Sequence, residues 1–310
     1  MYVTLDTIDF YCDSAKYYPA RDLAKFYNNV KIIRNLQNIN ADSIYYYRQF
    51  KKAIAWGDVH ISEPSHLLKA KKIIYETITE NSEGFKNVIM HDTTNGIYAK
   101  GEHYQHFATR NELFLFENVK VLNVEPETQD TTTIFCDSLY YKNKPDEEMA
   151  VARGKVKILR NKMIATGGLG KFYISADSIT LEKDPLISFE RNKIQARKVK
   201  LILMDGKISE IRLYEKAELH SYTDSTYTRE DILKGNFITM FFKNDSLYRV
   251  VAVKNAIGKY NIQEEGVEGL NYVTADSIKI FIKNNKADSL YVSGGTEGTY
   301  YPDKFRELAP

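Results

Sequence analysis

The sequence is poor in residues that cross-link or interrupt a chain. Only two cysteines, Cys12 and Cys136, occur in 310 residues, too few for a disulfide framework and not spaced as a metal knuckle. There are seven prolines and one tryptophan, against 23 tyrosines and 15 phenylalanines. Many aromatic residues with few prolines favour long, half-buried strands over a bundle of helices. We therefore predict an all-β fold.

Charge of one sign and long apolar runs are also missing. With 43 basic and 41 acidic residues, the net charge of +2 gives no global reason to expect a nucleic-acid partner. The sequence contains no run of about 18 apolar residues, which is the length that a transmembrane helix requires. The start, MYVTLDTIDF, lacks the basic and apolar regions of a signal peptide and begins in the middle of a pattern. We expect that a segment before it has been removed.

A short unit recurs along the chain, headed by an Asp-Ser pair after a small residue. The Asp-Ser pairs are Asp13-Ser14, Asp42-Ser43, Asp137-Ser138, Asp177-Ser178, Asp276-Ser277 and Asp288-Ser289. Asp and Ser side chains can bond their own backbone, and the parity of the apolar residues shifts across the pair. A catalytic residue has no reason to recur in every unit, so these pairs predict bends rather than catalytic groups.

The second part of each unit alternates between apolar and polar residues, which is the periodicity of a strand. Small residues begin the apolar face, which indicates either an unfilled hollow or two sheets that approach closely. Lysines and arginines occupy the opposite, solvated face. The residues predicted to face the interior are Ala24, Phe26, Val30, Ile32, Ala53, Ala55, Val59, Ile61, Ala150, Ala152, Val156 and Ile158.

Turn signals between the units favour antiparallel hairpins. Asp205-Gly206 is the sharpest, and 243–245 and 283–285 occupy matching places downstream. The polar stretch 125–133 is the best boundary and is predicted to be a long loop. The predicted division is a first half at 1–124, a second half at 134–301 continuous with the first, and a tail at 302–310 with a short helix over 302–308.

Three features that could suggest chemistry have simpler interpretations. His103 and His106, next to Glu102, would point to opposite faces of a strand and supply too few ligands for a metal site. The glycines of 165–171 lack the first Gly and the Ser/Thr of a phosphate loop, so a bulge or tight bend is predicted. Cys12 and Cys136 occupy positions where other units carry Ala, so we predict two free thiols. We expect no metal, no cofactor and no catalytic residue.

The unit ADSIYYYRQFKKAIAWGDVHI, followed by LLKAKKIIYE, resembles the repeat of the OstA-like family, which includes the LptA-type periplasmic proteins of lipopolysaccharide transport. The resemblance extends from about residue 11 to about residue 300 and is strongest to the longer members from bacteria related to Bacteroides. It implies an elongated, twisted antiparallel β-jelly roll, folded like an open V. It also implies a periplasmic location and an apolar interior that shelters the acyl chains of lipopolysaccharide.

The resemblance therefore favours an unfilled hollow over two closely approaching sheets. We expect a non-enzymatic lipid carrier in a bridge from the inner to the outer membrane. A fatty chain of about a dozen carbons gains on the order of 10 kcal/mol when it leaves water, before ordering costs. The expected partners are lipopolysaccharide and other Lpt-type proteins, or a second copy joined end to end by strand addition. The alternative is a structural or carbohydrate-binding β-solenoid, whose rungs would be parallel and whose interior would be filled.

Overall fold

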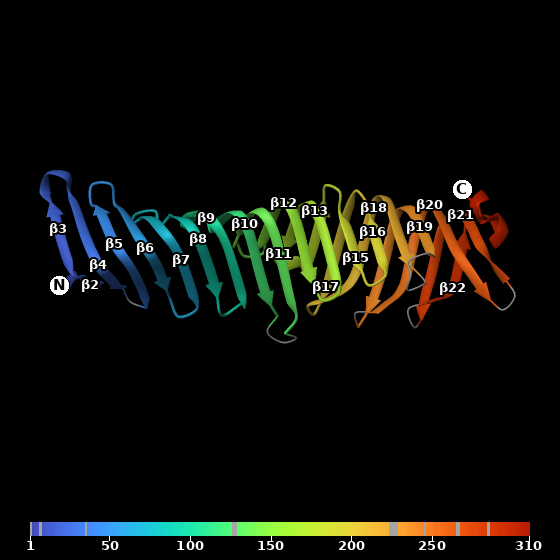
Figure 1. Cartoon of the computed structure of the whole chain (residues 1–310), viewed down its shortest axis with the longest axis horizontal. Helices are drawn as coiled ribbons and strands as arrows, with labels where there is room; N and C mark the ends of the chain where they lie inside the picture. The colour runs from blue at the N-terminus through green and yellow to red at the C-terminus, as the bar shows by residue number, and fades with distance from the viewer. Residues whose placement is uncertain are drawn as a thin grey trace. The chain divides into compact units, whose positions relative to one another are not determined.

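The computed structural model of the chain describes residues 2–5, 8–34, 36–125, 129–222, 229–244, 246–264, 267–283 and 286–310 (Figure 1). The described residues form 23 strands and four short 3₁₀ helices. Neighbouring strands pair in antiparallel fashion, as in β4 with β5 and β20 with β21. The predicted all-β, antiparallel fold is confirmed, and this pairing does not fit the parallel rungs of a solenoid. No helix among the described residues is long and apolar enough to cross a membrane.

The chain forms two compact units, residues 1–156 and 157–310, which divide inside β12. Within each unit the strands follow one another largely in sequence order (Figure 1). The elements of unit 1 are β1 (Tyr2–Leu5), β2 (Ile8–Tyr11), β3 (Ser14–Tyr18), η1 (Pro19–Arg21), β4 (Leu23–Arg34), β5 (Gln37–Tyr47), β6 (Lys52–Ser62), β7 (His66–Glu76), β8 (Ser82–Asp92), β9 (Ile97–Phe107), η2 (Ala108–Arg110), β10 (Glu112–Val124), β11 (Thr131–Lys142) and the first part of β12 (Met149–Arg160).

Unit 2 takes up the rest of β12 and the strands that follow it. Its further elements are β13 (Met163–Tyr173), η3 (Ile174–Ala176), β14 (Ser178–Glu182), β15 (Leu186–Phe189), β16 (Asn192–Gln195), β17 (Lys198–Met204), β18 (Lys207–Tyr222), β19 (Glu230–Lys243), β20 (Ser246–Glu264), β21 (Val267–Lys283), β22 (Lys286–Ser293), β23 (Glu297–Pro302) and η4 (Asp303–Leu308). The helix η4 lies one residue inside the predicted 302–308 and is a 3₁₀ helix.

The connection within the polar stretch 125–133 is shorter than the long loop that the sequence predicts. Strand β10 ends at Val124 and β11 begins at Thr131, and these two residues are register partners. The Glu125 N–H donates to the Asp130 carbonyl at 2.9 Å, which closes the connection. The stretch lies inside unit 1, and β10 and β11 pair directly across it. Residues 126–128 lie outside the described part.

The long strands of unit 1 bend in the middle, where the pairing register shifts. In β4 the shift falls at Asn28 and Asn29, whose φ angles are 57° and 52°. The partner strand β5 contributes only Asp42 to the same shift. Two residues therefore oppose one, as in a β-bulge, and the strands bend there. We call this line of bulges the corner, and the residues on either side of it the two arms of each strand.

The Asp-Ser pairs mark the corner, as the sequence predicts. In β5 the buried residues Ala41 and Ile44 lie three positions apart across Asp42, so the parity of the buried face shifts there. In β11 and β21 the register shift likewise falls at Asp137 and Asp276. The pair at Asp177 is different. Asp177 has a left-handed backbone with φ 41° and ends η3, which connects two strands.

An acidic side chain recurs at the corner because it packs against the bulge of the neighbouring strand. A Cβ added to Gly57, whose φ is 96°, would lie 2.1 Å from Asp42 Oδ2. Gly154, with φ 74°, faces Asp137 in the same way. Where asparagine replaces glycine, Asn29 Nδ2 donates to Asp13 Oδ2 at 3.0 Å. The recurring carboxylates therefore have a structural role that explains their repetition.

At the corner of β5, β7 and β11, a small residue is buried against a valine of the neighbouring strand. Val30 pairs with Ala41, Val59 with Ala70 and Val119 with Cys136, and all six side chains are buried. Cys136 thus occupies an alanine position, as the repeat predicts. Cys12 and Cys136 are both free and buried, which confirms the two free thiols.

Two further predictions concern turns. Asp205 and Gly206 have φ angles of 50° and 71° and connect the paired residues Met204 and Lys207, so the predicted tight hairpin is confirmed. In β13 the residues up to Thr166 pair with β15, and those from Leu169 pair with β14. The glycines between them allow the predicted bend. The turns at 243–245 and 283–285 lie partly outside the described residues.

Replacing Gly57 by alanine is expected to lower the free energy of unfolding by roughly 2–4 kcal/mol, because strain at positive φ adds to the overlap with Asp42. Urea denaturation measures the change. Gly298→Ala is the control, since its Cβ would meet nothing closer than 3.8 Å, and we expect it to change the stability by less than about 1 kcal/mol. Equal losses in the two variants would contradict the role of the corner.

The Cys136 thiol is expected to be inert in the folded protein. Burial, together with the nearby Asp137 charge, raises the pKa of Cys136 to about 12, so roughly one molecule in 10⁴ carries a thiolate there at pH 8. Labelling at pH 8 with a thiol-reactive disulfide should give two equivalents only after denaturation. A thiol of the native protein that reacts at the rate of free cysteine would show that the corner opens.

Candidate functional site

The inner face of unit 1, defined by its buried side chains, carries continuous apolar rows of register partners. In the arm that contains Val30, one row crosses nine strands from β2 to β11. Every member of this row is apolar, and none is charged. The row consists of Phe10, Ile32, Ile39, Ile61, Leu68, Met90, Ala99, Val121 and Ile134.

The opposite arm carries two rows with more aromatic residues. The row nearer the corner consists of Phe26, Ile44, Ala55, Ile73, Gly84, Tyr104, Leu115 and Leu139. The row farther from it consists of Ala24, Tyr46, Ala53, Tyr75, Ser82, His106, Leu113 and Tyr141. Burial lowers the pKa of His106, so this imidazole is neutral at pH 7 and adds no charge to the face.

Exposure on this face rises with distance from the corner. On β6, Val59 is 0% and Ala55 is 7% exposed, whereas Ala53 and Ile61, farther along the two arms, are only half-buried. A sheet face is fully buried only where a second layer covers it. The two arms of unit 1 therefore cover each other at the corner and leave apolar side chains accessible farther away.

The inner face of unit 2 is filled instead. Of the twelve largest fully buried side chains among the described residues, ten belong to unit 2, and Tyr104 and Leu115 belong to unit 1. A row of register partners in unit 2, Leu201, Ile211, Met240 and Val250, is at most 1% exposed throughout. Large branched side chains pack this interior to the density of an ordinary core.

The twelve residues predicted from the sequence all lie on inner faces, but with different exposure. Those that are half-buried are Ala24, Phe26, Ile32, Ala53, Ile61 and Ala150. Those that are buried are Val30, Ala55, Val59, Ala152, Val156 and Ile158. The buried group forms the core beside the corner, so only the half-buried group could touch a ligand without rearrangement. A role in binding lipid stays a prediction for all twelve.

Sequence reasoning missed several residues that share the same face. Tyr46, Tyr75 and Tyr141 lie in the far row, and burial raises the pKa of Tyr75 and Tyr141. The signal was present in the runs IYYY and LYY after two Asp-Ser pairs. The alternation of inner and outer residues shifts at the corner. The face on which these tyrosines lie therefore follows only when each strand is divided into two arms at the corner.

The histidines considered as metal ligands have other partners. His103 lies 2.8 Å from Glu83 Oε1 and stacks between Phe85 and Phe116 on the outer face, with centroid distances of 4.8 and 5.3 Å. His106 faces inward on the same strand, so the two point to opposite faces as predicted. Glu102 accepts a hydrogen bond from the Asn87 N–H at 3.1 Å. Among the described residues no group of three or more metal-ligating side chains occurs.

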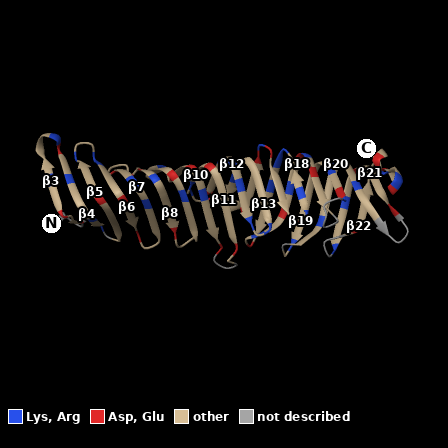
Figure 2. Ribbon diagram, viewed as in Figure 1, with Lys and Arg blue, Asp and Glu red and all other residues tan. Residues whose placement is uncertain are grey.

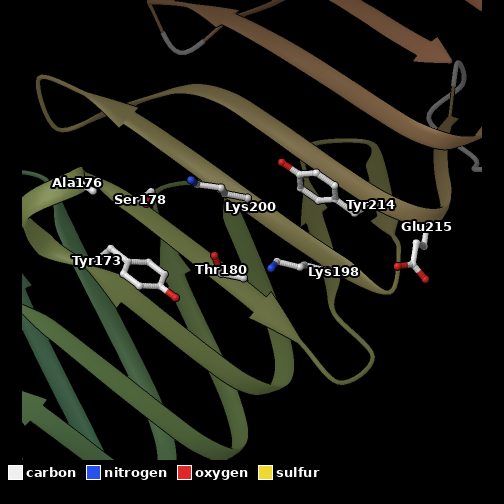
Figure 3. A pocket seen from close by; sticks show the side chains of 8 residues that line it. All are labelled: Tyr173, Ala176, Ser178, Thr180, Lys198, Lys200, Tyr214 and Glu215. Carbon is white, nitrogen blue, oxygen red and sulfur yellow. The ribbon is translucent and has the colours of Figure 1, made fainter.

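Two hollows are lined partly by charged residues, and Figure 2 shows that basic and acidic residues are interspersed along the strands. The hollow in unit 2 has a volume of about 550 Å³ and lies over β13, β14, β17 and β18 (Figure 3). It is lined by Tyr173, Ala176, Ser178, Thr180, Lys198, Lys200, Tyr214 and Glu215. The hollow in unit 1, about 410 Å³, is lined by Lys100, Asn118, Val119, Lys120, Phe135, Cys136, Asp137 and Lys155.

Comparison with known proteins finds a family similarity for the first part of the chain. Residues 2–128 match the family described as OstA-like protein. No curated protein matches the chain significantly. Among solved structures, the chain resembles LptH of Pseudomonas aeruginosa, described as the LptA-homologous periplasmic component of the conserved lipopolysaccharide transport device. The identity is 14%, the match covers 49% of this chain and 93% of LptH, and the TM-score is 0.23. With a score this low, the similarity to a known family rests on the match over residues 2–128.

The Tyr104 hydroxyl provides a test of the inner face. It is buried above Gly84, no hydrogen bond to it is present among the described residues, and burial raises the pKa of Tyr104 to about 12. Tyr104→Phe should therefore leave the stability unchanged or raise it by up to about 1 kcal/mol in urea denaturation. Tyr140→Phe is the control, because the Tyr140 hydroxyl donates to Glu112 Oε1 at 3.2 Å, and its loss should be slightly destabilising. The reverse order would contradict this environment of Tyr104.

Proposed function

We propose that the chain, whose residues 2–128 match the OstA-like family, is a non-enzymatic carrier of lipopolysaccharide in the periplasm. The half-buried apolar rows of unit 1 hold the acyl chains. The protein acts as part of a bridge from the inner to the outer membrane. It lowers the free energy of a lipid in transit by shielding its chains from water.

The observation that carries this proposal is the uncharged row of nine apolar residues from Phe10 to Ile134. Strands lie about 4.8 Å apart, so its eight steps extend over about 38 Å. Most of its members, including Ile32, Ile61 and Leu68, are only half-buried. Apolar surface of this length beside a packed corner can accept an elongated apolar ligand without a charged contact.

The tyrosines of the opposite arm suit the boundary between acyl chains and headgroup. Tyr46, Tyr75 and Tyr141 each offer an apolar ring and a polar hydroxyl, a combination that favours positions where one end is apolar and the other is wet. Tyr141 donates to Glu148 Oε1 at 2.6 Å, so its hydroxyl is directed to a polar partner. We assign these side chains to the mouth of the lipid-binding face.

The filled interior of unit 2 leads us to assign the acyl chains to unit 1 alone. To insert a chain between Leu201 and Ile211 or their neighbours would require displacing side chains that already pack against one another. Unit 2 therefore has another task in this proposal, such as stabilising the fold or recognising a partner.

Partners can join at the strand edges of unit 1. Within the described residues, β1 pairs only with β2, and β3 pairs only with β4. Such an edge presents free backbone groups that a strand of another Lpt-type protein, or of a second copy, can pair with.

Substitution of one isoleucine on each face of β6 tests the carrier. Ile61 lies in the uncharged row of the inner face, and Ile54 lies on the outer face of the same strand. Ile61→Glu should weaken the binding of a fluorescent lipopolysaccharide by about tenfold or more, because a charge would be left against apolar chains. Ile54→Glu, the matched control, should leave binding within about twofold of the unmodified protein.

A second measurement locates the lipid. Photo-crosslinking side chains at positions 53 and 61 should label bound lipopolysaccharide, whereas those at positions 54 and 60 should not. Labelling on both faces would indicate a nonspecific surface contact. A complete lack of labelling and binding would reject the carrier proposal.

A further inference from the structure

The outer-face hollow of unit 2 has the features of a small-molecule site that is separate from the lipid-binding face. Its volume of about 550 Å³ is within the range of ligand pockets, which is about 300–1,000 Å³. Its lining comes from adjacent strands of one sheet, so its geometry is fixed by register: Tyr173 pairs with Ser178, Thr180 with Lys200, and Lys198 with Tyr214. Figure 3 shows these side chains gathered on one face of the strands.

Two hydroxyls form the floor of the hollow. Ser178 and Thr180 are 5% and 4% exposed, which is unusual for polar residues on the outer face of a sheet. Neither hydroxyl has a side-chain partner within the described part of the chain, although both line the hollow. Neither hydroxyl oxygen is among the fully buried atoms without a partner in the described part of the chain, so both open to the hollow and offer donors and acceptors to a ligand.

The charges around this floor leave a net positive potential. Glu182 is shared between two lysines, at 3.4 Å from Lys171 Nζ and 3.6 Å from Lys198 Nζ. At the rim, Glu215 is paired with Arg197 at 3.2 Å. Lys200 has no carboxylate partner among the described residues, and its ammonium extends across the hollow beside Ser178 (Figure 3). An ammonium without a partner next to free hydroxyls suits an anionic group such as phosphate.

The flanking tyrosines add flat, partly apolar walls. Tyr173 and Tyr214 lie on opposite sides of the lysines and hydroxyls (Figure 3). A Tyr ring presents an apolar face and a polar tip, which suits a ligand that is itself both apolar in places and rich in hydroxyls. From these features together we infer that the hollow binds a sugar that carries a phosphate group.

In this arrangement Lys200 and Lys198 contact the phosphate, Ser178 and Thr180 bond ring hydroxyls or phosphate oxygens, and the tyrosines face the sugar ring. The ligand can come from two sources, a free sugar phosphate or the phosphorylated headgroup of a glycolipid. This site is separate from the proposed carrier function, because it lies on the outer face of unit 2, whose interior is filled. It can bind its ligand whether or not unit 1 carries acyl chains.

Calorimetric titration of the full chain with α-glucose 1-phosphate tests the inference at about 0.15 M salt, where weak nonspecific attraction is largely screened. We expect saturable binding, with glucose alone and inorganic phosphate alone each at least about fivefold weaker, because each lacks part of the recognised chemistry. Failure of the sugar phosphate to bind, or equal binding of phosphate alone, would overturn the assignment.

Two pairs of variants locate the site, and both controls lie in the same outer-face row of register partners. Lys200→Gln should weaken binding about tenfold or more, whereas Lys279→Gln should change it by less than about twofold. Thr180→Val should weaken it about three- to tenfold, and Thr239→Val should leave it unchanged. Because the Thr180 hydroxyl has no side-chain partner, the valine variant should keep its melting temperature, which separates a binding effect from misfolding. Equal effects in a variant and its control would overturn the site.

The source of the ligand is distinguished by competition. Deacylated lipopolysaccharide that displaces α-glucose 1-phosphate would identify a glycolipid headgroup, and failure to displace it would identify a free sugar phosphate; both outcomes support the site. The result is also independent of the carrier function. Ile61→Glu should weaken lipid binding about tenfold or more without affecting the binding of the sugar phosphate, and Lys200→Gln should keep the binding of acyl chains. Loss of both activities in Lys200→Gln would overturn a separate site.

Discussion

The structure of unit 1 depends on one backbone constraint, the bulge at which two residues of one strand oppose a single residue of the next, which is acidic in β5 and β11. The bulge requires positive φ at residues such as Asn28, Asn29 and Gly57, and a carboxylate that packs or bonds against them. It bends every long strand at the same level, so a single sheet can cover part of itself. Buried valines and alanines beside the bulges hold the two arms together.

The same corner can serve an open interior or a closed one, and side-chain volume decides which. In unit 1, alanine, glycine and half-buried residues such as Ile61 leave apolar surface accessible away from the corner. In unit 2, branched residues such as Ile211 and Ile238 fill the corresponding space. Burying those residues stabilises unit 2 by the hydrophobic effect, whereas unit 1 leaves part of that stabilisation to be gained by a ligand.

Much of this architecture could be predicted from the sequence, because strand alternation, the Asp-Ser pairs and Asp205-Gly206 are local signals. The inner face could be predicted only in part. The alternating pattern places Val59 and Ile61 on the same side of a strand, but it does not show that Val59 is buried and Ile61 only half-buried. That difference comes from the distance to the corner, and the corner is formed by pairings between strands that the sequence does not order. The hollow over Thr180 was missed for the same reason, since its lining residues meet only through register.

The two faces of the sheet can therefore recognise two kinds of chemistry without interfering with each other. Residues of opposite parity on one strand point to opposite faces, so β14 can direct Leu181 into a filled core and Thr180 into a polar hollow. In unit 1, β6 likewise directs Ile61 toward the apolar row and His60 outward. A substitution on one face should leave the chemistry of the other intact as long as the register holds. Because the corner bulges fix that register in unit 1, a carboxylate such as Asp42, which touches no proposed ligand, helps to hold both faces of β5 and β6 in place.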